Sequence, residues 1–420
     1  MLINETTREY IRQHENEDVR KLALHGTKDK GVDLPMALQQ IAGRQTARRK
    51  LPSWAAADGI VYPPHLNMEQ CSSEQTAKYK AGLVSDDESL LSGYGKEHTF
   101  VDLTGGFGVA FYWMSQGFKK RVYIEQNSEL CAISSENFRL LGLECSICCC
   151  DTATYLAKME KADVIYLDPA RRNEHGGRTY SIEDCTPNVL ELLPLLLEKA
   201  EKIILKLSPM LDWRKAVEDL KYVSEVHIIS VNNECKELLL VLGRESKGLQ
   251  SILCVNDNSV FRWFPPQKTK VSAIETIGFH RGNHRFPLWK PNGKTIPADN
   301  VQYLYEPNAS IMKAGCFMAV EEQYPVQQLS PNSHLFMSSV EIGDFPGRRF
   351  QICAVSSMNK QELKETLQGV EKANIAVRNF PLSVEQLRKK LKIKDGGYTY
   401  LFATTLADGQ HRLFICRKIG

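Results

Sequence analysis

The stretch Phe100-Val101-Asp102-Leu103-Thr104-Gly105-Gly106-Phe107-Gly108 decides how this chain of 420 residues folds. An apolar run ends at an acidic residue and enters a glycine-rich turn, after which we expect an amphipathic helix. Glycines lack a Cβ atom, so the backbone can turn sharply and lie close to a ligand. Dinucleotide-binding loops dock pyrophosphate on backbone N–H groups at a helix N-terminus, where Asp102 would repel it. The stretch therefore predicts a cationic ligand without phosphate. The absence of a G-x-G-x-x-G spacing also disfavours a nicotinamide dehydrogenase.

Residues 98–243 alternate between short apolar runs and helical stretches, which predicts a doubly wound, Rossmann-like α/β domain with a largely parallel sheet. The expected strands are 98–103, 121–124, 145–150, 164–167, 203–206, 227–230 and 237–242. Helices are expected before this region, at 5–25, 34–50 and 72–82. After about residue 250, short strands with helices at 360–370 and 383–391 predict small α+β domains.

Acidic residues follow four consecutive expected strands. The carboxyl ends of parallel strands meet at one edge of a sheet, where ligands bind. Glu125 follows Asp102 at about the spacing of a carboxylate that reads ribose hydroxyls, and Asp151 is placed to meet an adenine amine. S-adenosylmethionine fits a cationic ligand without phosphate, and it needs a tight turn for its amino-acid tail, an acidic partner for its ribose hydroxyls and a polar contact for its adenine. The expected cofactor-binding residues are Asp102, Thr104, Gly106, Gly108, Glu125, Asp151 and Asp168.

The fourth strand end, Asp168-Pro169-Ala170-Arg171-Arg172, is expected beside the transferred methyl group. Asp168 is the candidate to orient the acceptor or take its proton, with Arg171 as the second catalytic candidate. The alternative for Asp168 is a carboxylate that only caps the turn or holds the cofactor.

Substrate-binding candidates lie around this turn. Arg172 and Arg178 match phosphate geometry, and internal ion pairs with Glu174, Glu183 or Asp184 are the alternative. Lys206 and Ser208 follow the next strand toward the same edge, although Lys206 also suits a buried structural role. Cys71, Cys185 and Cys235 raise the question of covalent attack, which we disfavour because no cysteine stands near the turn at 207–209.

Through the loop at 102–108, Glu125, Asp151 and Asp168-Pro169-Ala170-Arg171, the chain resembles class I S-adenosylmethionine-dependent methyltransferases. Two departures stand out. Thr104 replaces the usual first glycine of the loop, and Ala170-Arg171 replaces the Pro-aromatic pair of amino-group methyltransferases. Without that aromatic residue there is no stacking platform at this position for a flipped base, which disfavours an exocyclic amine as the acceptor.

A narrower resemblance spans nearly the whole chain. Its marks are Met68-Glu69-Gln70-Cys71-Ser72-Ser73-Glu74, Asp168-Pro169-Ala170-Arg171-Arg172 with Gly177-Arg178, Lys206-Leu207-Ser208-Pro209, Asn233-Glu234-Cys235-Lys236-Glu237, Tyr305-Glu306-Pro307 and Lys394-Asp395-Gly396-Gly397. The chain resembles bacterial methyltransferases with a C-terminal THUMP-like domain, of the Bacteroidetes type that inserts a ferredoxin-like domain. The resemblance implies four parts: 1–92 helical, 93–247 methyltransferase, 248–325 ferredoxin-like and 326–420 THUMP-like. It also implies an RNA substrate, tRNA or rRNA.

Composition supports a cytoplasmic protein with reduced thiols. The chain has no apolar run long enough for a membrane span, no secretory signal, and twelve scattered cysteines. We expect no metal site, because Cys145 and Cys148–Cys150 alternate along a strand. The net charge of +3 gives no global argument for RNA. Two basic regions are local candidates for RNA contact: Arg44, Arg48, Arg49 and Lys50, and Arg388, Lys389, Lys390, Lys392 and Lys394.

Two other classes of function remain as alternatives. One is a methyltransferase that acts on a small molecule or a protein and uses the appended domains for assembly. The other is a catalytically silent RNA-binding protein, which the complete set of cofactor carboxylates disfavours.

Overall fold

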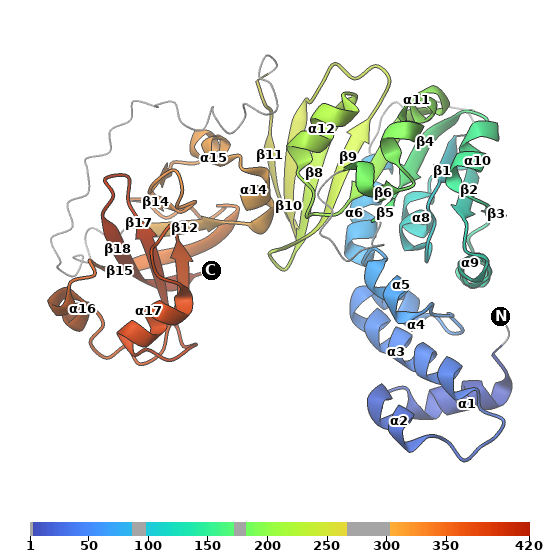
Figure 1. The fold of residues 1–420 in the computed structure, drawn as a ribbon, viewed down its shortest axis with the longest axis horizontal. Coiled ribbons are helices and arrows are strands. Elements are labelled where there is room, and N and C mark those ends of the chain that lie inside the picture. Colours follow the sequence, from blue (N-terminus) through green and yellow to red (C-terminus); the bar gives the residue numbers. More distant parts are fainter. Residues whose placement is uncertain (1–2, 86–97, 172–181, 267–302) are drawn as a thin grey trace. The chain divides into compact units, whose positions relative to one another are not determined.

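The computed structural model describes residues 3–85, 98–171, 182–266 and 303–420 (Figure 1). The chain divides into two compact units. The first comprises residues 1–212, 219–224 and 239–248, and the second comprises 213–218, 225–238 and 249–420. All expected cofactor-site residues fall within the first unit.

A nine-stranded sheet confirms the Rossmann-like α/β prediction. In spatial order its strands are β11 (Ser259–Trp263), β10 (Ser251–Asn256), β8 (Val223–Val231), β9 (Glu234–Leu242), β7 (Ala200–Leu207), β4 (Ala162–Leu167), β1 (Thr99–Asp102), β2 (Lys120–Glu125) and β3 (Ser146–Cys149). The run β3-β2-β1-β4-β7 is parallel throughout. The chain passes from β1 to β2 and β3 on one side and then to β4 on the other. Crossover at β1 and β4 places the expected ligand edge at their carboxyl ends.

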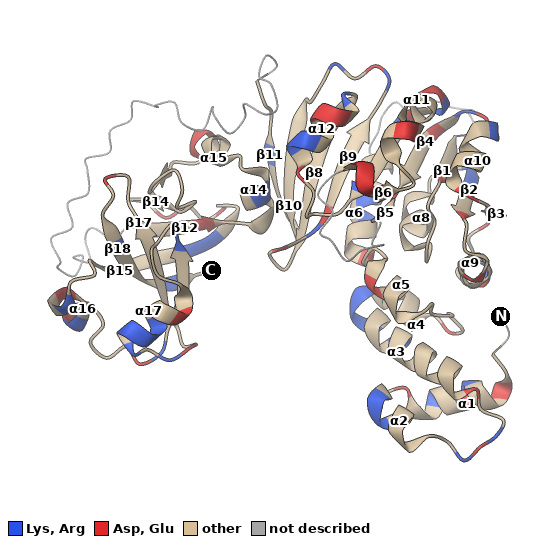
Figure 2. Cartoon of the chain, in the orientation of Figure 1, with Lys and Arg blue, Asp and Glu red and all other residues tan. Residues whose placement is uncertain are grey.

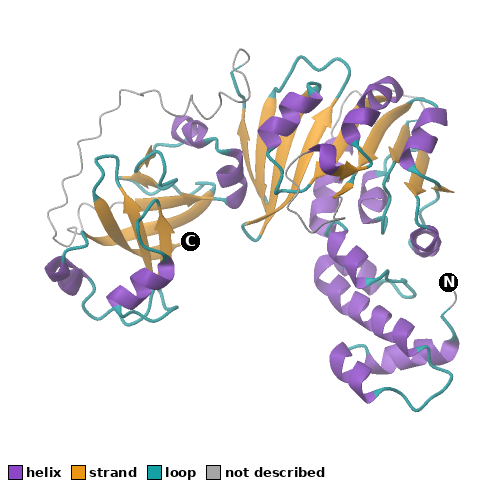
Figure 3. Cartoon of the chain, in the orientation of Figure 1, coloured by secondary structure: helices purple, strands orange, loops and turns teal. Residues whose placement is uncertain are grey.

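Helices lie between consecutive strands of the parallel run and after β7 (Figure 3). They are α8 (Val109–Met114), α9 (Ser128–Leu140), α10 (Thr152–Lys158), α11 (Val189–Lys199) and α12 (Trp213–Leu220), and a short 3₁₀ turn spans Ile182–Asp184. The side chains of Asn127, Asp151 and Asn188 accept backbone N–H bonds at the starts of α9, α10 and α11. β5 (Ala170–Arg171) and β6 (Cys185–Thr186) form a separate two-stranded sheet.

The N-terminal region is helical, as predicted. Its helices are α1 (Glu5–His14), α2 (Val19–His25), α3 (Leu34–Lys50), α4 (Pro52–Ala56), α5 (His65–Gln70) and α6 (Glu74–Ser85). The single helix expected at 5–25 is two helices, because Asp18 caps a new start with bonds from the N–H groups of Arg20 and Lys21.

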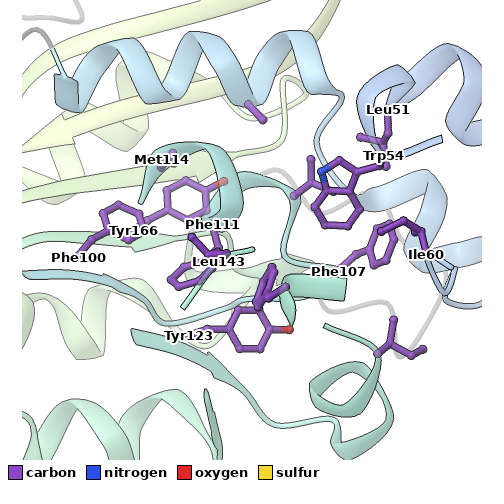
Figure 4. Packing of buried hydrophobic residues seen from close by; sticks show 14 of the residues in the cluster. Leu51, Trp54, Ile60, Phe100, Phe107, Phe111, Met114, Tyr123, Leu143 and Tyr166 are labelled. Carbon is purple, nitrogen blue, oxygen red and sulfur yellow. The ribbon is translucent and has the colours of Figure 1, made fainter. Parts of the chain in front are cut away.

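These N-terminal helices share a hydrophobic core with the sheet. The buried rings of Trp54 and Phe107 meet edge to face with centroids 5.1 Å apart (Figure 4). Asn137 on α9 hydrogen-bonds both the N–H and the C=O of Val61, each at 2.9 Å. Phe107 belongs to the glycine-rich loop, so residues of the helical region fix that loop from outside the sheet.

The second unit contains a seven-stranded sheet. In spatial order its strands are β13 (Gln327–Gln328), β14 (Phe336–Ser338), β12 (Tyr303–Pro307), β15 (Gly347–Ser356), β18 (His411–Ile419), β17 (Thr399–Thr405) and β16 (Asn374–Arg378). The predicted helices correspond to α16 (Lys360–Thr366) and α17 (Val384–Leu391), where Ser383 forms a capping box with Gln386. Sequence reasoning missed α14 (Ala309–Ala314) and α15 (Phe317–Gln323), which lack side-chain caps.

β10 and β11 extend the nine-stranded sheet, although both fall inside the expected 248–325 domain. The domain boundaries themselves remain a prediction. Within the described residues, no helix combines the length and apolar character that crossing a membrane requires. The same residues hold no cluster of three or more His, Cys, Asp or Glu side chains suited to a metal ion.

Candidate cofactor and acceptor site

Asp102 ends β1 with its side chain buried, at 1% exposure. Its Oδ1 accepts the N–H of Thr104 at 2.9 Å. Its Oδ2 is buried and has no hydrogen-bond partner among the described residues. A buried acceptor without a partner is costly, so this oxygen fits a ligand that donates a hydrogen bond.

Burial raises the pKa of Asp102 to about 8. The Thr104 N–H opposes this rise, the carboxylates of Asp168 and Glu125 add to it, and Lys80 opposes it. A cation beside Oδ2 would favour the ionised form of Asp102. The carboxyl is therefore poised to lose its proton when a positively charged group arrives.

The glycines of the loop have different roles. A Cβ on Gly105 would lie 2.1 Å from the Tyr123 ring, and one on Gly108 would lie 2.5 Å from Phe138. Gly106 and Gly108 also have positive φ angles of 56° and 81°. Gly106 has open space around its Cβ position, with nothing nearer than the Thr104 carbonyl at 3.8 Å. Packing alone accounts for Gly105 and Gly108, whereas Gly106 leaves room beside the loop.

Gly105→Ala is expected to displace the loop, because the new methyl group would overlap the Tyr123 ring. We expect cofactor affinity to fall at least about tenfold and the protein to lose about 1–3 kcal/mol of stability, as overpacking typically costs. Calorimetric titration and thermal unfolding would measure both effects. Gly117→Ala, at a site with no atom within 4 Å, is the matched control. A Gly105→Ala protein with unchanged affinity would contradict the loop assignment.

Glu125 ends β2 and supports the loop from the side. Its Oε2 accepts the Gly106 N–H at 2.9 Å, and its Oε1 accepts the Asn127 N–H at 2.8 Å. Carboxylate oxygens can accept more than one hydrogen bond each, so Glu125 retains capacity for ribose hydroxyls.

Asp151 lies at the next strand end, exposed to solvent. Its Oδ1 accepts the Thr154 N–H at 2.9 Å at the start of α10, and hydrogen bonding at this cap lowers the pKa of Asp151. The adjacent Thr152 hydroxyl donates to the Leu103 carbonyl at 2.7 Å. Asp151 thus has a structural role as the cap of α10. The bond from Thr152 to Leu103 joins the start of α10 to the β1 loop.

Asp168 follows β4 and is joined to both neighbouring strands. Its N–H donates to the Thr104 hydroxyl at 2.6 Å, and Lys206 Nζ lies 2.5 Å from its Oδ2. Threonine at the position of the usual glycine therefore links the β1 loop to the end of β4. The Ser208 hydroxyl accepts the Met210 N–H at 3.3 Å, within the turn after β7.

Several expected residues cannot be placed. The backbone of Arg171 pairs with Cys185 in the small sheet. The Arg171 side chain, Arg172 and Arg178 lie outside the described residues. Their roles remain predictions.

Lys80 and its neighbours are absent from the predicted site. Lys80 on α6 is fully buried, and its Nζ donates to Ser72 Oγ at 2.5 Å and to Tyr166 Oη at 3.3 Å. Tyr166 precedes Asp168 by two residues on β4. Ser72 belongs to the Met68–Glu74 motif that marks the family resemblance. Helical periodicity, however, gives no sign that a lysine eight residues later is buried.

The cysteine thiols are poorly suited to nucleophilic attack. Burial raises the pKa of Cys71 and of Cys235, and Cys185 is also buried. Lys50, Lys206 and Lys80 partly oppose this effect at Cys71. Since the thiolate is the attacking form, these surroundings disfavour a nucleophilic role for the three thiols.

The two basic regions differ in how their charges are used. Arg44 and Arg48 pair with Glu15 at 3.3 and 3.1 Å, and Lys50 donates to the carbonyls of Met68 and Glu69. Near the C-terminus, Arg388 pairs with Asp395 at 2.6 Å. Five exposed lysines nearby form no ion pair with any described residue: Lys372, Lys389, Lys390, Lys392 and Lys394. We call these five the C-terminal lysine patch. The basic residues of α17 colour part of that helix blue in Figure 2.

Residues 347–418 match the family model described as THUMP domain-like, and residues 303–346 match a ferredoxin-like domain. The C-terminal domain is THUMP-like. The C-terminal lysine patch lies within this THUMP-like domain. The ferredoxin-like match overlaps the expected 248–325 range at 303–325 and continues beyond it. Both domain types were expected from the sequence, and both are confirmed.

The whole chain is similar to a crystal structure from Porphyromonas gingivalis W83 described as a "putative methyltransferase". The identity is 29%, all of both chains is covered, and the TM-score is 0.79. An S-adenosylmethionine-dependent methyltransferase from Agrobacterium tumefaciens is 16% identical over 41% of this chain and 62% of its own, with a TM-score of 0.30. TrmK from M. capricolum, solved with S-adenosylhomocysteine, is 11% identical over 41% and 68%, also at 0.30. The last two scores are too low to support an assignment. No curated protein matches the chain.

Proposed function

We propose that this protein is an S-adenosylmethionine-dependent methyltransferase that modifies an RNA base, in tRNA or in rRNA. The observation that carries the proposal is the buried Oδ2 of Asp102 beside a glycine turn, an oxygen that no other described residue hydrogen-bonds. The carboxylates of Glu125 and Asp168 stand at neighbouring strand ends. Full-length similarity to the P. gingivalis protein supports the same class of reaction.

Each part of the cofactor has a candidate partner. Asp102 and the turn at Thr104–Gly106 would hold the amino-acid tail, with the Oδ2 atom accepting from its ammonium group. Glu125 would accept hydrogen bonds from the ribose hydroxyls, and Asp151 would meet the adenine amine. All three carboxylates follow parallel strands of one sheet, so they share one edge.

S-adenosylmethionine supplies an electrophilic methyl group on a sulfonium. Positioning accounts for much of the catalysis in such displacements. Asp168 would orient the acceptor atom and take the proton that it releases, at Oδ1. Lys206 holds Oδ2 at 2.5 Å, and the Thr104 hydroxyl fixes the Asp168 backbone. The carboxylate is thereby held in one orientation.

The THUMP-like domain supports RNA as the substrate class, and its lysine patch provides a second argument. Next to the patch, Tyr398 is 93% exposed after Gly396 and Gly397, which both have positive φ angles. An exposed aromatic ring among unpaired lysines suits single-stranded nucleic acid, because rings stack on bases while ammonium groups neutralise phosphates.

Incubation of the full-length protein with methyl-labelled cofactor tests the proposal. Bulk tRNA, rRNA and a cell lysate would be offered separately. The proposal expects label in an RNA base, recovered as a methylated nucleoside. Label found only in protein or in small metabolites would favour the alternative methyltransferase, and RNA binding without cofactor binding would favour the silent protein.

Replacing Lys389, Lys390 and Lys392 together by alanine is expected to weaken RNA binding and to reduce its salt dependence. The slope of log affinity against log salt should fall by about two, at roughly 0.7 per lost phosphate contact on single strands. Filter binding at several salt concentrations would measure it. Lys360 and Lys364 on α16, replaced together, provide a control within the same domain. An unchanged slope in the triple variant would show that the C-terminal lysine patch does not bind RNA phosphates.

A further inference from the structure

We propose that Lys80 is a positioning residue of the cofactor site: its buried ammonium group, held by Ser72 and Tyr166, lies on the same face of the sheet as Asp102 and shifts the pH range in which the cofactor binds. The inference deepens the proposed function and rests on it. Lys80 comes from the helical region that precedes the sheet, so α6 would contribute a residue to the cofactor site.

Strand register places the two groups on one face of the sheet. Asp102 pairs with Tyr166 across β1 and β4 and with Tyr123 across β1 and β2. Partners in register direct their side chains to the same face. Lys80 Nζ bonds Tyr166 Oη and lies 5.5 Å from the centre of its ring. Lys80 therefore lies on the face to which Asp102 points.

The charge of Lys80 acts where water screens it little. Its side chain has no exposed surface, and Asp102 is nearly as deeply buried. Electrostatic effects are strong at such positions. Lys80 lowers the pKa of Asp102, although burial has the larger and opposite effect. Among the described residues, the titratable and charged groups around Asp102 are Lys80 from α6, Tyr123 and Glu125 from β2, and Tyr166 and Asp168 from β4.

Ser72 also holds the ammonium group of Lys80 in place. Its hydroxyl accepts from Lys80 Nζ at 2.5 Å, and Ser72 is itself buried. This contact gives the Cys71-Ser72-Ser73-Glu74 segment a defined role, since it carries the acceptor that orients the ammonium group.

Titration of S-adenosylhomocysteine into the full chain, from about pH 6 to about pH 10, tests the inference. Below the pKa of Asp102 the cofactor must displace a proton, so wild-type affinity should rise with pH toward that pKa. It should fall again at higher pH, where the ammonium group of the ligand loses its own proton. Lys80→Met should move this rise up by about one pH unit, which weakens binding roughly tenfold near neutral pH. Lys80→Arg should restore the wild-type profile. Lys119→Met removes an exposed charge elsewhere in the same unit and should leave the profile unchanged.

The Asp102→Asn background separates this role from a structural one. There the Lys80→Met change should cause no shift with pH, because the group that it acts on is gone. If Lys80→Met does not fold, Lys80→Gln, which keeps a donor for Ser72, should show the same shift. Binding by Lys80→Met or Lys80→Gln with an unmoved pH profile would overturn the inference. Absence of binding by the wild type would instead overturn the proposed function.

Discussion

Asp168→Ala is expected to lower methyl transfer by about a hundred- to ten-thousandfold, the usual contribution of a positioned acid or base. Cofactor affinity should stay within a few-fold of wild type, because the bonds from Thr104 N–H to Asp102 and from Gly106 N–H to Glu125 hold the loop without the Asp168 side chain. Single-turnover transfer of labelled methyl to RNA would give the rate, and calorimetry would give the affinity.

Two further variants make the Asp168 result interpretable. Lys206→Met removes the ion pair at 2.5 Å while keeping the carboxylate, so it should reduce the rate less than Asp168→Ala. Glu160→Gln changes a highly exposed carboxylate just before β4 and should have no effect. If Asp168→Ala mainly lost cofactor affinity, Asp168 would be a binding residue rather than a catalytic one.

Asp102→Asn is expected to weaken cofactor binding about ten- to a hundredfold, since hydrogen bonds to charged groups contribute about 1.5–3 kcal/mol. The variant should also lose the pH dependence of binding. In the wild type, affinity should rise by up to about tenfold per unit as the pH approaches about 8, the raised pKa of Asp102. A variant with wild-type affinity at every pH would contradict the role of Asp102.

The same residue predicts how stability depends on pH. Its pKa is raised in the folded protein from 3.8 to about 8, so the unliganded fold holds this proton more tightly than the unfolded chain does. That contribution to stability is present below about pH 4 and is lost as the pH rises through about 8. The melting temperature of Asp102→Asn should therefore fall less between about pH 5 and about pH 9 than the melting temperature of the wild type.

Sequence patterns predicted the parallel sheet because its strands are buried on both faces and read as short apolar runs. They also located Asp102, Glu125, Asp151 and Asp168, since side chains at strand ends follow directly from chain order. The THUMP-like and ferredoxin-like domains were predicted from the family resemblance and not from the periodicity of apolar residues.

Contacts between segments that are far apart in the chain could not be predicted from the sequence. Nothing in the local pattern around Lys80 shows that it meets Tyr166, 86 residues later. The pairing of Lys206 with Asp168 and the bond from Asp168 to Thr104 arise only when β1, β4 and β7 lie side by side. The tight packing of Gly105 could not be predicted for a related reason, because its neighbour is the Tyr123 ring on another strand.

The central claim is that the β1 loop with Glu125 and Asp168 holds S-adenosylmethionine. Calorimetric titration of the full-length wild type with S-adenosylhomocysteine near pH 8 tests it most directly. We predict one site per chain, with affinity that is reduced in Asp102→Asn and in Gly105→Ala. A folded wild-type protein that binds neither S-adenosylhomocysteine nor S-adenosylmethionine at any pH would contradict the account.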